Sequence, residues 1–192
     1  MRSVSCLLLV FALAATGCQQ LGAVRYGRDL IEASFHSAWY WEETDDTWQV
    51  QFYFLPSFTY YIKEEIGVGA ETGFFWSHSR TDYGLFSVNT YHFELPVLGT
   101  VTFLFSDVSR KPQITPYVKP LFGFVYARDN VSGDSDSDFA PVIGVSAGVK
   151  MGLSSDVCAD LRFDIRHIEY DRDFGGSLER LGLFAGFSVF FR

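Results

Sequence analysis

Charged side chains stand at every second position of one segment near the C-terminal end of the chain. Asp160, Arg162, Asp164 and Arg166 alternate with hydrocarbon side chains. Successive side chains of a β-strand point to opposite faces, so this spacing collects the four charges on one face. Two carboxylates and two guanidinium groups that share a face can form ion pairs with one another, or they can line a path for ions.

The polar faces of similar segments carry six further charges, which gives five acids and five bases in total. They are Glu32, Glu71, Glu94, Asp160 and Asp164, and Lys119, Lys150, Arg162, Arg166 and Arg180. An unpaired charge in a narrow interior is costly, so this balance predicts mutual neutralisation. If these segments enclose a narrow interior, we expect the charges to form a network that plugs it. The alternative is a gated path for ions.

A second candidate for chemistry is His167-Ile168-Glu169. Its spacing resembles the His-x-Ser motif of PagL-type lipid A deacylases, which are eight-stranded barrel enzymes. In this chain Glu169 stands where that family has its nucleophilic Ser, and a carboxylate cannot form the Ser–His pair that acyl transfer requires. We therefore expect no catalytic residue, and we interpret His167 as a rim residue where a strand leaves the bilayer.

The residues that could bind a metal ion are not spaced as they are in known types of metal site. The acidic stretch Asp129–Asp138 looks like a calcium loop but lacks the closing Glu of an EF-hand, whose loop is also flanked by helices. We expect a solvated flexible loop there, with weak divalent-cation binding as the alternative. The chain has four scattered histidines, at positions 36, 78, 92 and 167. The sequence therefore predicts no metal site and no cofactor.

The elements that must position these side chains are eight segments with period-two alternation. They cover about 29–41, 48–58, 66–76, 92–103, 117–126, 143–151, 157–166 and 181–191. Each has about ten residues or more, the length that a tilted strand needs to cross a bilayer. The pattern predicts an all-β fold, an eight-stranded antiparallel up-and-down transmembrane β-barrel.

The two faces of these segments favour a membrane barrel over a soluble one. One face is bulky, aromatic and almost free of charge, and aromatic residues make up 18% of the chain. The other face, with its Gly, Ser, Thr and charges, is too small and polar to be the core of a soluble barrel. Exposing the bulky face to water would cost more than the net stability of a domain, and lipid removes that cost.

Composition excludes several other classes of protein. A chain of 192 residues predicts a single domain. Past the N-terminus no run of eighteen apolar residues is available for a spanning helix. The net charge of -8 excludes nucleic acid as a partner, because no basic stripe is available to neutralise phosphates.

The N-terminal residues have the pattern of an export signal. Arg2 precedes an apolar stretch, Val4–Ala14, that is too short to span a bilayer. The small residues before Cys18 resemble the lipobox of bacterial lipoproteins, which implies a lipidated Cys18; the alternative is ordinary cleavage after Ala14. We divide the chain into a signal (1–17), a periplasmic tether (18–27) and a barrel (28–192). Cys158 alone remains in the barrel, which predicts no internal disulfide.

The connections and tryptophans suggest which end of the barrel faces outward. With a periplasmic N-terminus, the periplasmic links are 63–65, 106–113 and 154–156. The extracellular connections are 42–46, 79–87, 129–138 and 171–177. Trp39, Trp41, Trp48 and Trp76 then fall near the extracellular rim, as an interfacial aromatic girdle would.

The C-terminal segment has apolar residues at 183, 185, 187 and 189 and ends on Phe191, followed by Arg192. This pattern, over residues 28–192, resembles small bacterial outer-membrane barrels of the OmpA and OmpX kind. The resemblance implies an outer-membrane location, with Phe191 in the signal that the barrel-assembly machinery reads. It also implies contact with outer-membrane lipid and lipopolysaccharide. We expect a monomer with a non-enzymatic structural or surface-interaction role. The alternatives are a lipid A-modifying barrel enzyme and a narrow channel.

Overall fold

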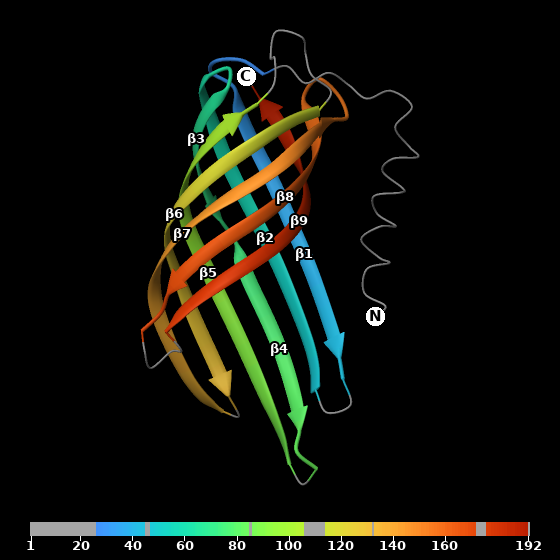
Figure 1. Cartoon of the computed structure of the whole chain (residues 1–192), viewed down its shortest axis with the longest axis vertical. Coiled ribbons are helices and arrows are strands. Elements are labelled where there is room, and N and C mark those ends of the chain that lie inside the picture. Colours follow the sequence, from blue (N-terminus) through green and yellow to red (C-terminus); the bar gives the residue numbers. More distant parts are fainter. Residues whose placement is uncertain are drawn as a thin grey trace.

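The computed structural model describes residues 26–44, 47–84, 86–105, 114–131, 133–171 and 176–191. They form one antiparallel sheet closed by pairing of its first and last strands (Figure 1). The strands are β1 (Ile31–Glu43), β2 (Thr47–Lys63), β3 (Ile66–Thr72), β4 (Phe74–Asp82), β5 (Ser87–Leu104), β6 (Ile114–Val131), β7 (Asp134–Gly152), β8 (Val157–Glu169) and β9 (Ser177–Phe191). The predicted all-β up-and-down barrel is confirmed.

Strands β3 and β4 share one of the eight positions around the barrel. Both pair with β2 and with β5, and the register does not change between them: Glu71 lies opposite Ser57, and Phe74 lies opposite Phe54. The break falls at Gly73, whose φ is 141°. A Cβ at this position would lie 2.0 Å from the carbonyl oxygen of Phe54, so only glycine allows this approach. The nine strand segments therefore correspond to the eight that the sequence predicts.

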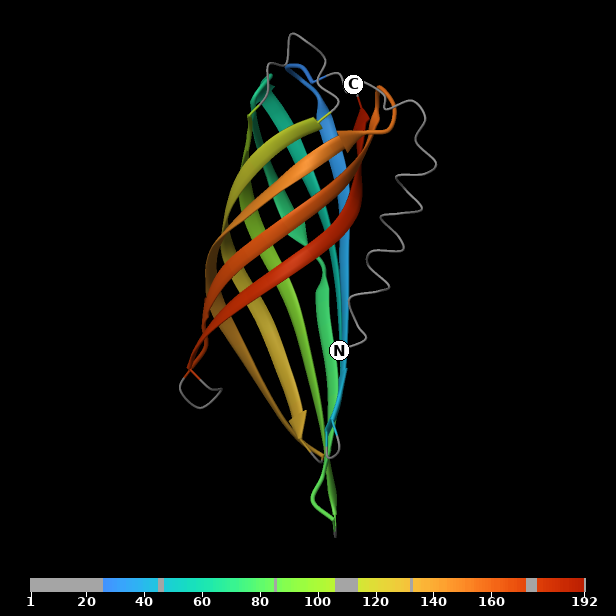
Figure 2. The same cartoon turned by 45° about the vertical axis from the view of Figure 1, so that its right-hand side comes forward.

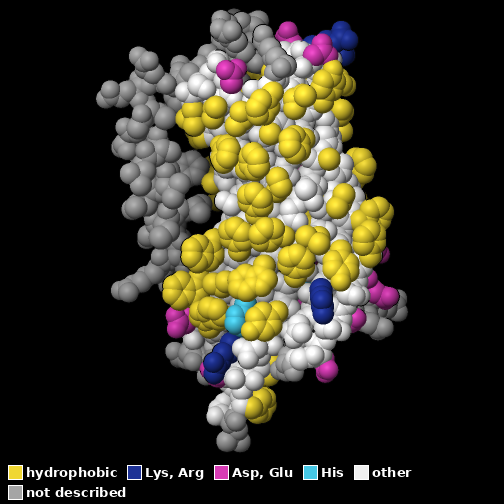
Figure 3. Space-filling view, turned by 180° about the vertical axis from the view of Figure 1, so that it is seen from behind, with side chains coloured by type: hydrophobic (Ala, Val, Ile, Leu, Met, Phe, Trp, Pro, Cys, Tyr) yellow, Lys and Arg dark blue, Asp and Glu magenta, His cyan; other side chains and the backbone are white. Residues whose placement is uncertain are grey.

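Alternation sorts the side chains of each strand between lumen and exterior. In β8, Asp160 and Arg162 are buried, whereas Phe163 and Ile165 are each 43% exposed. Figure 3 shows hydrophobic side chains over the middle of the outer surface, with charged side chains gathered toward its two ends. This distribution suits a barrel whose middle contacts hydrocarbon.

The end of the barrel that carries the C-terminus has short turns. β2 and β3 are joined through residues 64–65, and β7 and β8 through residues 153–156. This is the end that the sequence analysis assigns to the periplasm, and the predicted link 106–113 lies outside the described residues. None of the described residues belongs to a helix that is long and apolar enough to cross a membrane.

At the opposite end the strands run further than predicted. The acidic stretch Asp129–Asp138, expected to be a flexible loop, is mostly strand, because β6 continues to Val131 and β7 begins at Asp134. The predicted connection 79–87 is likewise shortened by β4, which extends to Asp82. The reason is that paired backbone groups remain satisfied outside the bilayer as well as inside it, so a hairpin can continue past the membrane.

The barrel wall has unequal height at this second end. β1 pairs with β9 only over Ile31–Ser37, although β1 continues to Glu43 beside β2. β7 similarly extends beyond β8, since its residues 134–141 pair with β6 alone. Figures 1 and 2 show the consequence: at this end, strands β8 and β9 stop well short of the level that β1, β2, β4, β5, β6 and β7 reach.

A largely aromatic cluster fills the barrel at the end that carries the C-terminus. Its buried members are Tyr26, Leu30, Tyr61, Leu104, Tyr117, Cys158 and Phe190. The rings of Tyr26 and Phe190 meet edge to face with centroids 5.5 Å apart. Tyr26 falls in the predicted tether, so the packed barrel begins before the expected boundary at residue 28. The predicted signal, Cys18 and the rest of the tether up to residue 25 lie outside the described residues.

Candidate functional site

The ten charged residues predicted for the lumen all lie inside the barrel, and each forms an ion pair with at least one of the others. Nine of them are buried, and the Arg180 side chain is 16% exposed. They form three layers along the barrel. Named for the ends to which the sequence analysis assigns them, these are a periplasmic layer (Glu32, Lys150, Asp160), a central layer (Glu71, Lys119, Arg162, Asp164, Arg166) and an extracellular layer (Glu94, Arg180).

The periplasmic layer has two carboxylates around one ammonium group. Lys150 Nζ donates hydrogen bonds to Glu32 and, at 2.8 Å, to Asp160 Oδ2. Its third bond reaches Ser188 Oγ at 3.0 Å. His36 Nε2 lies 3.1 Å from the same Asp160 oxygen. All three protons of the ammonium group are therefore used, which fixes its position in the lumen.

The central layer is built around Arg162, which is fully buried. Its guanidinium donates to Glu71 Oε2 at 2.6 Å and to Asp164 Oδ2 at 2.7 Å. Arg166 donates to the same two carboxylates at 2.7 Å each, and Lys119 Nζ donates to Glu71 at 3.2 Å. The planar fork of arginine suits this bridging between two carboxylates.

These two layers complement each other in charge. The periplasmic layer contains two acids and one base, and the central layer contains two acids and three bases, so their formal charges are -1 and +1. Both layers draw on the inward face of β8, where Asp160 and Arg162 are neighbours. Tyr117 adds a hydrogen bond to Asp160 at 2.9 Å. Together with the Glu94–Arg180 pair, the ten side chains sum to zero.

The extracellular layer gains partners that the sequence analysis did not include. Arg180 donates to both oxygens of Glu94, and Tyr170 Oη donates to Glu94 Oε1 at 2.6 Å. Burial and the neighbouring Glu94 carboxylate raise the pKa of Tyr170, which keeps it a donor. His92 Nε2 lies 2.6 Å from the same carboxylate, and its Nδ1 contacts Asp129.

Of these two partners of Glu94, His92 could have been predicted from the sequence and Tyr170 could not. His92 has the parity of an inward residue, which is a signal that could have added it to the charge network. Tyr170 follows the end of β8, where alternation no longer indicates direction. Its contact with Glu94, 76 residues away, depends on closure of the barrel.

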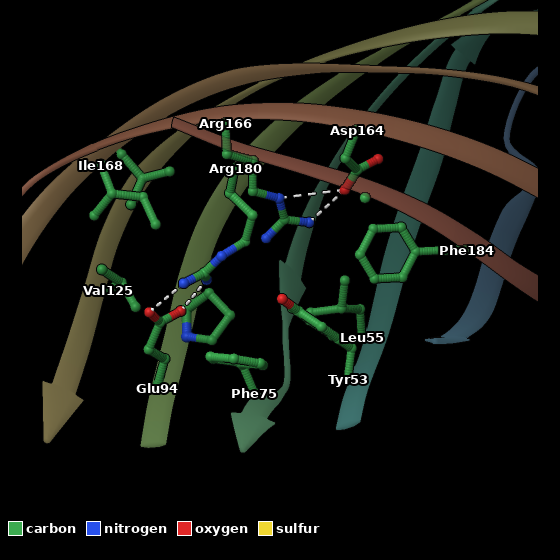
Figure 4. Close-up of a pocket in the computed structure, with 13 residues that line it drawn as sticks. Tyr53, Leu55, Phe75, Glu94, Val125, Asp164, Arg166, Ile168, Arg180 and Phe184 are labelled. Atoms are coloured by element: carbon green, nitrogen blue, oxygen red, sulfur yellow. Dashed lines mark hydrogen bonds and ion pairs between the residues drawn. The ribbon is translucent and has the colours of Figure 1, made fainter. Parts of the chain in front are cut away.

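Little space remains between the central and extracellular layers. A cavity of about 20 Å³ lies there, lined among others by Tyr53, Phe75 and Phe184. That volume holds about one water molecule. Figure 4 shows Arg166 and Arg180 reaching into this region from the wall, with Arg166 paired to Asp164 and Arg180 paired to Glu94. Paired side chains therefore occupy most of the lumen between these two layers.

The two polar residues considered for acyl-transfer chemistry, His167 and Glu169, have the same parity near the end of β8. His167 has the outward parity of β8, and it lies opposite Glu179 of β9 and Ile143 of β7.

The remaining predicted residues lie as follows. Phe191 ends β9 opposite Ile31 and is 51% exposed on the outer face. Asp138 accepts a hydrogen bond from the backbone N–H of Asp171 at 2.7 Å. Among the described residues, no group of three or more His, Cys, Asp or Glu side chains is arranged to hold a metal ion.

Comparisons with known proteins identify the fold. No family model and no curated protein matches the chain. The outer-membrane protein OprG of Pseudomonas aeruginosa is similar in structure, with a TM-score of 0.56 and 11% identity over 89% of this chain and 99% of OprG. Ail, the attachment invasion locus protein of Yersinia pestis, has a TM-score of 0.51 and 11% identity over 86% of this chain and 99% of Ail. The chain therefore has the fold of small bacterial outer-membrane β-barrels, and its apolar exterior agrees with the predicted location.

Proposed function

We propose that this chain is a non-enzymatic, non-conducting outer-membrane β-barrel protein that acts through the part of its wall outside the cell. The observation that carries the proposal is the filled lumen. All ten interior charges are paired, and the cavity above the central layer holds about one water molecule. A barrel of eight strands is just wide enough for side chains to fill.

The pairing also explains why an open ion path is disfavoured. An ion that crosses the central layer would have to separate Arg162 and Arg166 from both of their carboxylates, Glu71 and Asp164. Breaking one buried pair costs about 3–5 kcal/mol when the remaining charge stays uncompensated. Beyond this layer the ion would meet the aromatic cluster at the periplasmic end.

The height of the wall supports a surface-interaction role. β5, β6 and β7 contain 18, 18 and 19 residues, whereas about 9–11 residues are enough to cross the bilayer. The excess forms hairpins at the end opposite to the C-terminus, and the β4–β5 hairpin reaches furthest (Figure 2). At its tip, Tyr83 and Phe86 are exposed and stacked with ring centroids 5.3 Å apart. Exposed aromatic side chains at the tip of a hairpin are suited to contact a partner.

Planar-bilayer recording tests the non-conducting part of this proposal. Purified, folded protein should give no steady current, because the ion pairs of the central layer and the aromatic cluster both stand in the way of an ion. A large and reproducible open-channel current from the wild-type protein would overturn the proposal in favour of a channel.

A matched variant shows that the recording can detect an opened lumen. Arg162→Ala combined with Glu71→Ala and Lys119→Met removes the central pair together with the ammonium that depends on Glu71, and it leaves Arg166 paired with Asp164. We expect this variant to pass more current than the wild type. Its migration on gels before and after boiling confirms that the barrel is folded.

A further inference from the structure

An outward-facing groove lies on the wall formed by β4, β5 and β6. It has a volume of about 510 Å³ and is lined by Trp76, Tyr91, His92, Phe93, Arg128 and Asn130. The Tyr91 ring stacks on His78 with centroids 4.3 Å apart, so one aromatic wall of the groove is held in place. The groove therefore combines rigid aromatic surface with one cationic side chain.

Arg128 has no carboxylate partner on this surface. It lies opposite Phe93 of β5 and Ser137 of β7. The next outward residues on those strands are Tyr91, Leu95, Ser135 and Phe139, and none is acidic. No described carboxylate forms an ion pair with Arg128. Arg80, another outward arginine at this end of the barrel, is instead paired with Asp82 at 3.2 Å.

The position of Arg128 along β6 places its charge at the boundary of the apolar band. The outward residues on its periplasmic side are Phe122, Phe124 and Tyr126, all exposed, and the next outward residue beyond it is Asn130. Aromatic residues gather where hydrocarbon meets lipid headgroups, and arginine extends its charge toward that layer.

We propose that this groove binds a phosphate group of a phosphorylated glycolipid in the outer leaflet. The guanidinium of Arg128 donates two hydrogen bonds to the phosphate, and the aromatic side chains contact the sugar and the first carbons of the acyl chains. Arginine matches phosphate geometry with a bidentate fork, and a lone cation in an apolar setting gains most from an anionic partner. The inference rests on the outer-membrane placement in the proposed function.

Native mass spectrometry of the detergent-purified full chain tests the site. The probes are lipid A with two phosphates, lipid A without phosphates, and inorganic phosphate. We expect wild-type protein to retain the bisphosphorylated lipid, and Arg128→Ala to weaken retention about 10- to 100-fold through loss of a charge-assisted contact. Arg128→Lys, which keeps the charge but not the fork, should fall between them.

The matched control is Arg80→Ala, which removes a paired arginine and should leave retention unchanged. Equal retention by wild type and Arg128→Ala would overturn the site, and so would equal retention of the lipid without phosphates. If inorganic phosphate binds with the same dependence on Arg128, the ligand of the groove is a free anion, and the proposal of a lipid site is wrong. A silent bilayer recording alongside lost lipid binding would leave the proposed function intact, whereas a conducting wild type would overturn that function alone.

Discussion

Lys119 and Lys150 are both buried, but they differ in how many carboxylates depend on each of them for a cation. Among the described Lys and Arg residues, Lys150 alone pairs with Glu32 and Asp160. Lys119 is the third cation around a carboxylate, Glu71, that already has two arginines. The effect of removing either ammonium group therefore depends on the charge left behind in its layer.

This difference predicts that Lys150→Met and Lys119→Met will have unequal effects on stability. Lys150→Met leaves two buried carboxylates without their ammonium, and we expect it to lower the free energy of unfolding by about 3–5 kcal/mol. Lys119→Met removes the surplus positive charge of the central layer, and its cost should be a fraction of that value. Urea unfolding in lipid vesicles measures both; equal losses for the two variants would contradict the layered charge balance.

At the scale of an element, β1 changes its surroundings halfway along its length. Its first seven residues lie between β2 and β9, and the rest, from Ala38 to Glu43, pair with β2 alone. In an antiparallel strand, successive N–H groups point alternately to the two neighbours. The second half of β1 should therefore have every other amide without a strand partner.

Amide hydrogen exchange in detergent micelles tests this property of β1. Over Ile31–Ser37 all amides should exchange slowly, because both neighbours are present. Over Ala38–Glu43 slow and fast amides should alternate. Uniform protection of the amides up to Glu43 would mean that β9 pairs with the whole of β1. That result would contradict the pairing over Ile31–Ser37 alone.

For the whole molecule, closure of the barrel brings together a sheet with an apolar exterior and a filled interior. β1 and β9, at opposite ends of the chain, pair from Ile31–Phe191 to Ser37–Ala185. Closure satisfies the backbone groups of both edges at membrane depth, which lipid cannot do. The same closure joins the residues of the three charged layers.

Closure predicts the behaviour of the protein in cells and on gels. It should fractionate with outer membranes, and unheated samples should migrate faster than boiled ones, because the closed barrel stays compact until heat breaks its strand pairing. Recovery in the soluble periplasmic fraction would contradict the membrane barrel. A boiled sample that migrates like the unheated one would contradict the closed fold.

The sequence by itself determined the number of transmembrane segments, the direction of their side chains and the ten interior charges. Alternation is a local property: in a strand, residues two apart share a face whatever the rest of the chain does. For this reason the parity of β8, from Asp160 to Arg166, predicts burial without knowledge of any partner. The break at Gly73 did not disturb this inference, because the register continues across it.

Only the tertiary structure decided which charges meet and how high the wall stands. Glu71 and Arg162 are 91 positions apart, and their contact depends on the curvature of the closed sheet. The contact of Tyr170 with Glu94 and the unpaired state of Arg128 depend likewise on neighbours from other strands. The ends of the strands could not be predicted from the sequence either, because polar residues such as those of 129–138 suit an exposed hairpin and a loop equally well. Such features depend on pairing across the sheet, and alternation within one segment carries no information about its partner.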